Sequence, residues 1–310
     1  MIGALRVRDV VGAILVGITY RAPMRRWIGL TKYRLNLLVL FAVGGGYVTA
    51  SGREVDAVGA AFAALGAALS AFGASALNMV MERDFDARMD RTRDRPVASG
   101  EVSPRAAVVF GVSLLLAGLG ILAAKTTWTA AAVSAAVALI YLGLYTPLKR
   151  VTTLNTLVGA VPGALPPVLG WAAAGGSLTA PAPWVMFGII FFWQIPHFLA
   201  IATVYRDDYE RGGFRMLPAV DPTLGLCARQ VVLNTVALIL VSMAVVAPAV
   251  GLCGSRFLVV ALVSGAVFLA FAMRFAWVRD VATAKRLFWA SLVYLPVVWA
   301  FLVIDRIPRA

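Results

Sequence analysis

The sequence predicts an all-α membrane protein, and three observations lead to this fold class. Of the 310 residues, 61% are hydrophobic and 14% are charged, whereas a soluble domain has about 45–50% apolar and about 25% charged residues. The apolar residues gather in runs of about 20, which is the length of a helix that crosses the hydrocarbon core of a bilayer. The runs are continuous rather than alternating, and this pattern excludes a transmembrane β-barrel.

Nine of these runs are long enough to span a membrane with some tilt. In chain order they cover residues 34–50, 57–81, 106–124, 128–145, 151–174, 184–205, 230–250, 257–277 and 287–304. An eleven-residue apolar segment at 10–20 is too short to span, and we interpret it as an interfacial piece of a cytoplasmic N-terminal extension, residues 1–29. Residues 30–310 are then expected to form one membrane-embedded domain.

The fifth and sixth runs contain residues that interrupt a simple apolar helix. Six glycines and prolines lie between Gly159 and Gly170, so we expect the fifth helix to kink or open, which a membrane tolerates where the helix lines a cavity. Asn155 lies near the start of this run. The sixth run contains the only histidine of the chain, His197, beside Pro196. A polar side chain within a span is a functional candidate, although a lone histidine can equally be a satisfied buried residue.

The basic residues divide unequally between the two sides of the membrane. The N-terminal tail and the second, fourth, sixth and eighth loops hold 23 of the 28 lysines and arginines, and the other side holds five. The positive-inside rule places the first side in the cytoplasm. The net charge of +13 is therefore interpreted as a topology signal, and binding to nucleic acid is disfavoured.

Ten of the 15 acidic residues lie in two of these cytoplasmic loops. Six fall between Glu82 and Glu101, after the second span, and four fall between Asp207 and Asp221, after the sixth. A separation of four spans indicates two pseudo-repeats, at about 34–145 and 151–277, followed by a ninth helix at 287–304. The repeat is topological, because the two halves have no strong residue-level identity.

The first acidic loop has the spacing of a helical stripe. Asn78, Glu82, Asp86 and Asp90 recur every four residues, so a second helix that continued to Asp90 would place them on one face. Like charges at this spacing repel by about 0.2–0.5 kcal/mol per pair, and a bound cation would remove that cost. Oxygen ligands of this kind suit Mg²⁺, which shares its coordination shell with substrate phosphates. The alternative is a surface loop whose acids pair with neighbouring arginines.

Other charged residues are expected at the same cytoplasmic rim. Lys149 and Arg150 cap the inner end of the fourth span, and Asp207 and Asp208 follow the sixth. The rim would thus combine carboxylates for a metal ion, cations for phosphate and a cavity between helices. This combination predicts a substrate with a diphosphate head and a hydrocarbon tail.

Four signatures, in order along the chain, resemble the UbiA superfamily of intramembrane prenyltransferases, and within it the protoheme IX farnesyltransferases. They are Asn78-x3-Glu82-Arg-Asp84-x-Asp86 continuing to Arg91-Thr92-x2-Arg95-Pro96, Tyr145-Thr-Pro147-Leu-Lys149-Arg150 with the breaker-rich segment from Asn155, Trp193-Gln-x-Pro196-His197-Phe198, and Tyr205-Arg-Asp-Asp208-Tyr209 ending at Met216-Leu217-Pro218. The resemblance covers the chain from about Leu30. Tyr33 departs from it, since the family usually has proline there, and Glu82 stands where many members have aspartate.

The resemblance implies a nine-helix bundle with a central cavity that opens at the cytoplasmic side of a bacterial inner membrane. It implies transfer of a farnesyl group from farnesyl diphosphate to a vinyl group of haem B, with addition of water, giving haem O for terminal oxidases. A haem A synthase or an oxidase assembly factor is the implied protein partner. The implied Mg²⁺ ligands are Asn78, Glu82, Asp86 and Asp208, with Lys149 and Arg150 on the diphosphate. The other residues implied at the substrates are Asp90, Arg91, Arg95, Asn155, His197, Arg206 and Asp207.

Two other functions compete with this interpretation. A prenyltransferase of the same superfamily with an aromatic acceptor, such as hydroxybenzoate or a naphthoate, would share the acidic loops. The run from Trp193 to His197 and the run from Arg91 to Pro96 favour haem. A transporter would place its acids deep within the spans, whereas here they lie at the rim.

Overall fold

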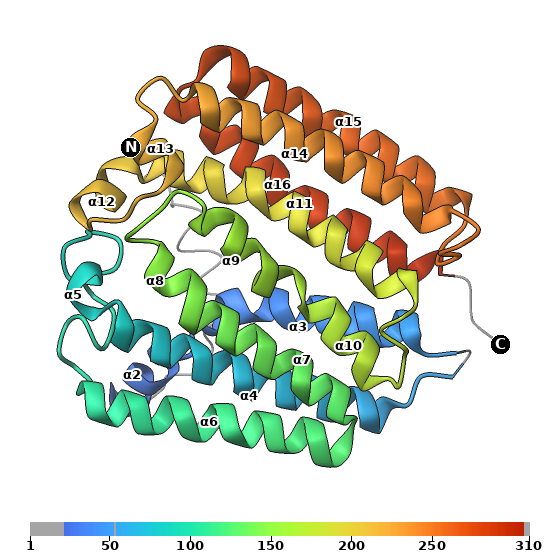
Figure 1. Cartoon of the computed structure of the whole chain (residues 1–310), viewed down its shortest axis with the longest axis horizontal. Helices are drawn as coiled ribbons and strands as arrows, with labels where there is room; N and C mark the ends of the chain where they lie inside the picture. Colours follow the sequence, from blue (N-terminus) through green and yellow to red (C-terminus); the bar gives the residue numbers. More distant parts are fainter. Residues whose placement is uncertain (1–21, 53, 307–310) are drawn as a thin grey trace, which may run out of the picture.

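The computed structural model describes residues 22–52 and 54–306 (Figure 1). Its regular elements are helices, and within the described residues nine helical segments are long and apolar enough to cross a membrane. The nine segments are Tyr33–Ala50 (α3), Ala57–Met81 (α4), Pro104–Lys125 (α6), Trp128–Leu148 (α7, η1 and α8), Asn155–Ala173 (α9 and α10), Pro181–Val204 (α11), Gly225–Val246 (α14 and η2), Ser255–Val278 (α15) and Val281–Ile304 (α16). The all-α fold and the number of spans are thus confirmed for this part of the chain. The segment predicted to be interfacial, at 10–20, lies outside the described residues.

Three of these spans are composite, and short helices fill the connections. The parts of the composite spans are Trp128–Leu139 (α7), Ile140–Tyr145 (η1), Thr146–Leu148 (α8), Asn155–Ala164 (α9), Pro166–Ala173 (α10), Gly225–Met243 (α14) and Ala244–Val246 (η2). The short helices are Ala22–Leu30 (α2), Arg83–Asp86 (α5), Arg206–Arg211 (α12) and Leu217–Val220 (α13).

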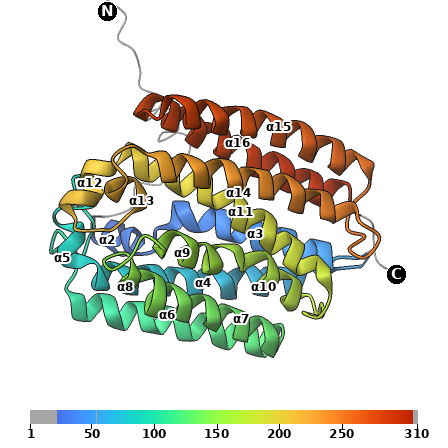
Figure 2. The same cartoon turned by 45° about the horizontal axis from the view of Figure 1, so that its top comes forward.

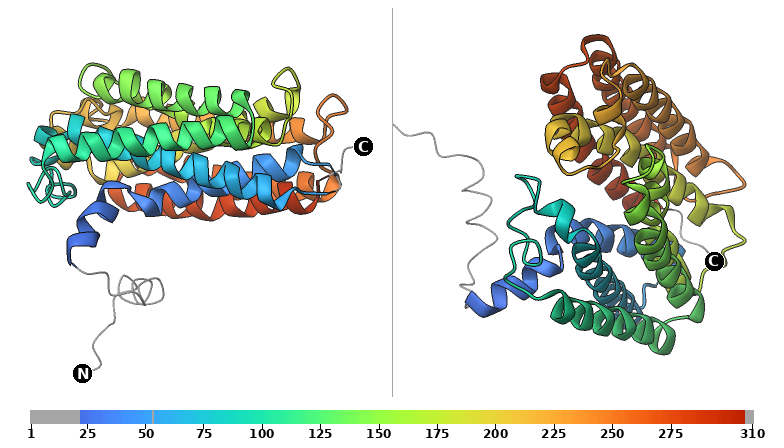
Figure 3. Two further views of the ribbon diagram at one scale, coloured as in Figure 1. Left: turned by 90° about the horizontal axis from the view of Figure 1, so that it is seen from below. Right: turned by 60° about the vertical axis from the view of Figure 1, so that its left-hand side comes forward.

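The long helices run side by side as one bundle (Figure 2). Helices α4, α6 and α7 lie on one side and α14, α15 and α16 on the other, with α9, α10 and α11 between them (Figures 1 and 3). The two connections that carry α5 and α12 meet at one end of the bundle, at the left in Figure 1. We call this the acidic end; it consists of residues 82–101 and 205–221 and the helix termini next to them.

The outer helices expose large apolar side chains to their surroundings. Leu116, Leu139, Val263 and Ile304 are all more than half exposed. The segment formed by α9 and α10 and the helix α11 are the most buried of the nine spans. A soluble protein rarely exposes apolar surface on this scale, whereas lipid tails solvate it without cost.

The fifth span is broken, as its glycines and prolines predict. Helix α9 ends at Ala164 and α10 begins at Pro166, because a proline lacks the backbone N–H that would continue the helix. Helices α10 and α3 approach closely at two glycines. A Cβ atom at Gly170 would overlap the carbonyl oxygen of Val43, and one at Gly46 would overlap that of Pro167.

A small cavity of about 40 Å³ lies between α3, α4, α7 and α10. Its wall includes Ser70, Ser134 and Pro166, and the Ser70 hydroxyl is buried there without a hydrogen-bond partner among the described residues. A volume of this size suits one or two water molecules rather than a prenyl chain. The large central cavity expected from the sequence therefore stays a prediction.

The expected single stripe from Asn78 to Asp90 is wrong. Helix α4 ends at Met81, α5 covers only Arg83–Asp86, and turns follow up to Asp90. The chain changes direction at Glu82, so Asn78, Glu82 and Asp86 are buried whereas Asp90 is exposed. The regular spacing in sequence does not continue as a regular helix, because the backbone N–H groups of Asp90 and Arg91 donate to Asp208 of the second acidic loop instead of continuing the helix.

Candidate active site

Asn78 lies near the end of α4, and both ends of its side-chain amide are engaged. Its Nδ2 donates to Oγ1 of Thr146 at 3.0 Å, and its Oδ1 accepts from Nζ of Lys32 at 2.6 Å. Lys32 links α2 to α3 with a φ of 46°, which is uncommon for a residue with a side chain. Burial lowers the pKa of Lys32 to about 7, and the positive charge of Arg95 adds to this effect.

Glu82 and Asp86 lie next along the chain, with 3% and 1% of their surfaces exposed. Nζ of Lys149 lies 2.7 Å from Oε1 of Glu82. Nη1 of Arg95 lies 2.6 Å from Oδ2 of Asp86 and 3.9 Å from Oε2 of Glu82. The two carboxylates therefore share one guanidinium group, and the first acidic loop folds back onto α8 and onto itself.

These contacts set the charge states of Glu82 and Lys149. Burial raises the pKa of the Glu82 carboxyl, but the positive charges of Lys149, Lys32 and Arg95 outweigh burial and hold the pKa below its ordinary value. Burial lowers the pKa of Lys149, but Tyr145 and Glu82 outweigh burial and raise the pKa above its ordinary value. Both groups are therefore charged at neutral pH.

One carboxylate oxygen of this cluster has no partner. Within the described residues, Oδ1 of Asp86 is buried and accepts no hydrogen bond, which is costly for a charged group. A Mg²⁺ ion fits here, since it is commonly bound by one or two carboxylates and by substrate phosphates. No three acidic, histidine or cysteine side chains gather at metal-binding distance in the part of the chain that the structure describes. The predicted ligand set of four residues therefore stays a prediction.

Asp208 joins the two acidic loops. Its carboxylate accepts hydrogen bonds from the backbone N–H groups of Asp90 at 3.2 Å and Arg91 at 3.3 Å, and it pairs with Arg211. Arg211 also lies 2.7 Å from Oδ2 of Asp90. Asp208 is buried whereas its neighbour Asp207 is exposed, so the structure separates two aspartates that the sequence leaves equivalent.

Two arginines of the predicted site lie over aromatic rings. The guanidinium carbon of Arg91 lies 5.3 Å from the ring centre of Tyr205 and 5.4 Å from that of Tyr209. The corresponding distance from Arg150 to Phe85 is 4.4 Å, and Nε of Arg150 is buried without a partner among the described residues. Such stacking holds a guanidinium group in place and leaves N–H groups free to bind an anion.

Asn155 and Arg206 differ in their contacts: Asn155 forms hydrogen bonds within the protein, and Arg206 forms no ion pair with another described residue. Nδ2 of Asn155 donates to the carbonyl oxygens of Thr152 at 2.5 Å and Arg215 at 2.9 Å, so this side chain ties the start of α9 to the chain after α12. Arg206 begins α12, is half-buried and forms no ion pair with another described residue. The predicted substrate contacts of both residues stay predictions.

His197 lies within α11, and its ring stacks on Trp193 and Phe288 at centroid distances of 4.9 and 5.0 Å. Its Nδ1 is 2.8 Å from Oγ of Ser291 in α16. The Ser291 hydroxyl also donates to the carbonyl oxygen of Phe288 at 2.5 Å. Because that hydroxyl has one proton, Nδ1 of His197 must be the donor to Ser291. The other ring nitrogen, Nε2, is then unprotonated and keeps its lone pair.

The sequence reasoning missed two basic residues that contact the acidic cluster, Lys32 and Arg211. Lys32 precedes the first span and Arg211 follows Asp208 by three residues. The sequence identifies both only as charges that set the topology, because nothing in their local sequence distinguishes them from other flanking cations. Only the fold brings Lys32 to Asn78, 46 residues along the chain.

Comparison with known proteins identifies the family. Residues 38–295 match the family model described as the UbiA prenyltransferase family. The chain belongs to the UbiA prenyltransferase family. Together with the nine apolar helices found among the described residues, this membership makes the chain a multi-pass membrane protein.

Three relatives of this chain are protoheme IX farnesyltransferases. The protoheme IX farnesyltransferase of Solibacter usitatus is 41% identical over 292 residues, which cover 91% of this chain and 99% of the relative. That of Opitutus terrae is 41% identical, with coverages of 92% and 96%. The mitochondrial protoheme IX farnesyltransferase of Homo sapiens is 36% identical and covers 86% of this chain, which spans 59% of the human protein.

Solved structures have the same fold at lower identity. A structure of digeranylgeranylglyceryl phosphate synthase matches with a TM-score of 0.76 and 13% identity, and covers 91% of this chain and 98% of its own. A UbiA homologue from Archaeoglobus fulgidus, bound to GPP and Mg²⁺, matches with a TM-score of 0.61 and 14% identity, with coverages of 89% and 99%. These two matches establish the shared bundle.

Proposed function

We propose that this chain transfers a farnesyl group from farnesyl diphosphate to a vinyl group of haem B, giving haem O and diphosphate. The observation that carries the proposal is the match along nearly the whole chain to relatives named protoheme IX farnesyltransferase, at up to 41% identity. The predicted haem-specific runs, from Arg91 to Pro96 and from Trp193 to His197, lie within the matched region. An aromatic acceptor is the disfavoured alternative.

The reaction needs charged groups that bind the diphosphate and an apolar interior that excludes water from the allylic cation. The bond between farnesyl C1 and the diphosphate oxygen breaks, and diphosphate leaves with the electron pair. The allylic carbon bonds to the vinyl group, and the cation left beside the porphyrin ring takes a water oxygen and loses a proton. The apolar helix faces exclude water from the allylic cation until the carbon–carbon bond has formed.

The acidic end supplies the groups that bind the diphosphate head. Mg²⁺ bound by Glu82 and Asp86, with Asn78 and Asp208 completing the predicted set, would neutralise charge on the departing diphosphate. Without ligand, each of these four residues contacts a basic side chain. The pairs are Asn78 with Lys32, Glu82 with Lys149, Asp86 with Arg95, and Asp208 with Arg211. On substrate binding these cations turn to the diphosphate oxygens, joined by Arg150, Arg91 and Arg206.

His197 is suited to bind the iron of the haem substrate. Its Nε2 has a free lone pair, and Ser291 fixes the tautomer and the ring orientation through Nδ1. We place the acidic end and the N-terminus in the cytoplasm, from the distribution of lysine and arginine, and the chain in a bacterial inner membrane. The product would pass to a haem A synthase or an oxidase assembly factor.

The test is chromatography of haems extracted after incubation with haem B, farnesyl diphosphate and Mg²⁺. Wild type is compared with Asp86→Ala and with Asp84→Ala, which removes an exposed carboxylate two residues away. We expect wild type and Asp84→Ala to form a more hydrophobic haem with the mass of hydroxyethylfarnesyl addition, and Asp86→Ala to form none. If wild type left haem B unchanged but released diphosphate with hydroxybenzoate or a naphthoate, the acceptor would be aromatic.

A further inference from the structure

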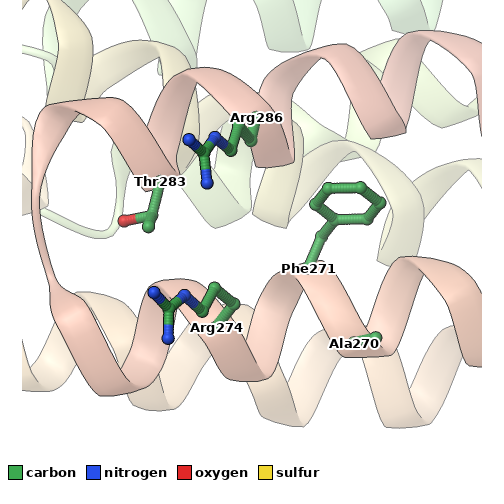
Figure 4. Close-up of a pocket in the computed structure, with 5 residues that line it drawn as sticks. All are labelled: Ala270, Phe271, Arg274, Thr283 and Arg286. Atoms are coloured by element: carbon green, nitrogen blue, oxygen red, sulfur yellow. The ribbon is translucent and has the colours of Figure 1, made fainter.

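A basic cavity lies between α15 and α16, apart from the acidic cluster. Its volume is about 180 Å³, and it is lined by Ala270, Phe271, Arg274, Thr283 and Arg286. Figure 4 shows the two guanidinium groups directed from their separate helices into the space between them. Neither arginine forms an ion pair or hydrogen bond with another described residue.

The cavity lies near one end of the helical bundle. Helix α15 ends at Val278, one turn beyond Arg274, and α16 begins at Val281, so the arginines lie at the same end of the bundle as the acidic loops. Trp277 and Trp289, on the same two helices, are 86% and 65% exposed. Trp277 lies in the last turn of α15, and exposed tryptophans at a helix end are typical of the level of lipid headgroups. Arg274 precedes this end by one turn and Arg286 lies in the second turn of α16, so both are expected near the height of a phospholipid phosphate.

The cavity keeps a net positive charge, although Asp280 lies close enough to Arg286 to interact with it electrostatically. Asp280, in the connecting turn, accepts from the N–H and the hydroxyl of Thr283, both at 2.7 Å, and makes no direct contact with either arginine. Lys285 and Arg279 nearby add positive charge. Toward the membrane interior the wall becomes apolar with Ala270 and Phe271.

We propose that this cavity binds the phosphate of an anionic phospholipid, with an acyl chain along the groove between α15 and α16. Two guanidinium groups can bind phosphate oxygens through paired N–H groups. Basic pockets between membrane helices recognise anionic headgroups in this way. The apolar floor and the exposed tryptophans favour an amphiphile over a free phosphate ion. The site does not depend on the prenyltransferase chemistry.

The test is native mass spectrometry of the full chain in detergent, with phosphatidylglycerol and phosphatidylcholine competing. The variant Arg274→Gln/Arg286→Gln is compared with Arg105→Gln/Arg229→Gln, which removes two exposed arginines from other helices at the same end. Wild type and the control variant should retain phosphatidylglycerol preferentially. The cavity variant should lose roughly tenfold or more in affinity, because each arginine near an anionic headgroup contributes substantially.

Two outcomes would overturn the proposal. Equal retention of phosphatidylglycerol by the two double variants would mean that the arginines only extend into the headgroup region. Displacement of the lipid by an equal concentration of inorganic phosphate would assign the cavity to a free anion. If the double variant does not stay folded, the single variants Arg274→Gln and Arg286→Gln are compared with the control for retention of phosphatidylglycerol.

Discussion

Nζ of Lys149 and Oε1 of Glu82 lie 2.7 Å apart, with only 14% and 3% of their side-chain surfaces exposed. This buried pair joins the end of the fourth span to the end of the second. A charge in this setting is costly without its partner, because little water remains to solvate it. The pair therefore holds two spans together and keeps a predicted metal ligand and a predicted diphosphate-binding cation at one place.

The first prediction concerns the stability of this pair. Glu82→Gln leaves Lys149 buried without its carboxylate, and Lys149→Met leaves Glu82 with only the more distant Arg95, so each should lower the free energy of unfolding, by at most about 3–5 kcal/mol. The double variant Glu82→Gln/Lys149→Met should be more stable than either single variant, although all three should lose activity. Thermal unfolding in detergent measures this difference. Strictly additive losses in the double variant would mean that the two groups do not interact.

The fold was largely predictable because the membrane constrains it so strongly. Continuous apolar runs and the asymmetry of the basic residues determine the number of helices, and the prolines of the fifth run determine its break at Leu165. The close packing of α10 against α3 was not predictable. The packing depends on which glycines of α3 face the backbone of α10. Gly46 does and Gly44 does not, and the sequence around them does not show this difference.

The second prediction tests that packing. Gly46→Ala should destabilise the chain by about 1–3 kcal/mol, since the added methyl group overlaps the carbonyl oxygen of Pro167, which cannot move independently of α10. Gly44→Ala, two residues earlier in the same helix, meets nothing within 4 Å and should be neutral or stabilising by up to about 1 kcal/mol. Thermal midpoints of the two variants provide the comparison. Equal midpoints would contradict the close approach of α3 and α10.

The third prediction concerns the metal ion. Chelation with EDTA should abolish haem O formation, and Mg²⁺ should restore it, because the buried Oδ1 of Asp86 has no partner within the described residues and the diphosphate supplies the other ligands. Ca²⁺ should restore activity less well, since it is larger and demands more ligands. Full activity in EDTA would mean that the basic side chains alone neutralise the leaving group.

The candidate site was predictable only in part, and its basic residues show why. Carboxylates are uncommon in a membrane protein, so the two acidic loops, with Glu82 and Asp86, could be chosen from their spacing, whereas Asp208 could be preferred to Asp207 only through the family resemblance. Lys32 could not, because its partner Asn78 is reached only through the packing of α2 and α3 on α4. The stripe ending at Asp90 failed for a related reason. A tertiary contact, the bond from Asp90 N–H to Asp208, decided the local backbone.

The last prediction assigns a positioning role to Ser291. Bound haem B should give the absorption spectrum of a histidine ligand in wild type, and His197→Gly should lose that spectrum and regain it with added imidazole. Ser291→Ala removes the acceptor that holds Nδ1–H, so the ring loses its fixed orientation and haem affinity should fall about tenfold or more.

Ser264→Ala is the matched control for Ser291→Ala, because the Ser264 hydroxyl bonds only carbonyl oxygens of its own helix, α15. It should leave both the spectrum and the haem affinity unchanged. A serine that merely filled space would give the same result at either position. Identical haem spectra and affinities for Ser291→Ala and Ser264→Ala would therefore remove Ser291 from the haem site. Failure of imidazole to restore the spectrum of His197→Gly would remove His197 as the iron ligand and leave it as a packing residue between Trp193 and Phe288.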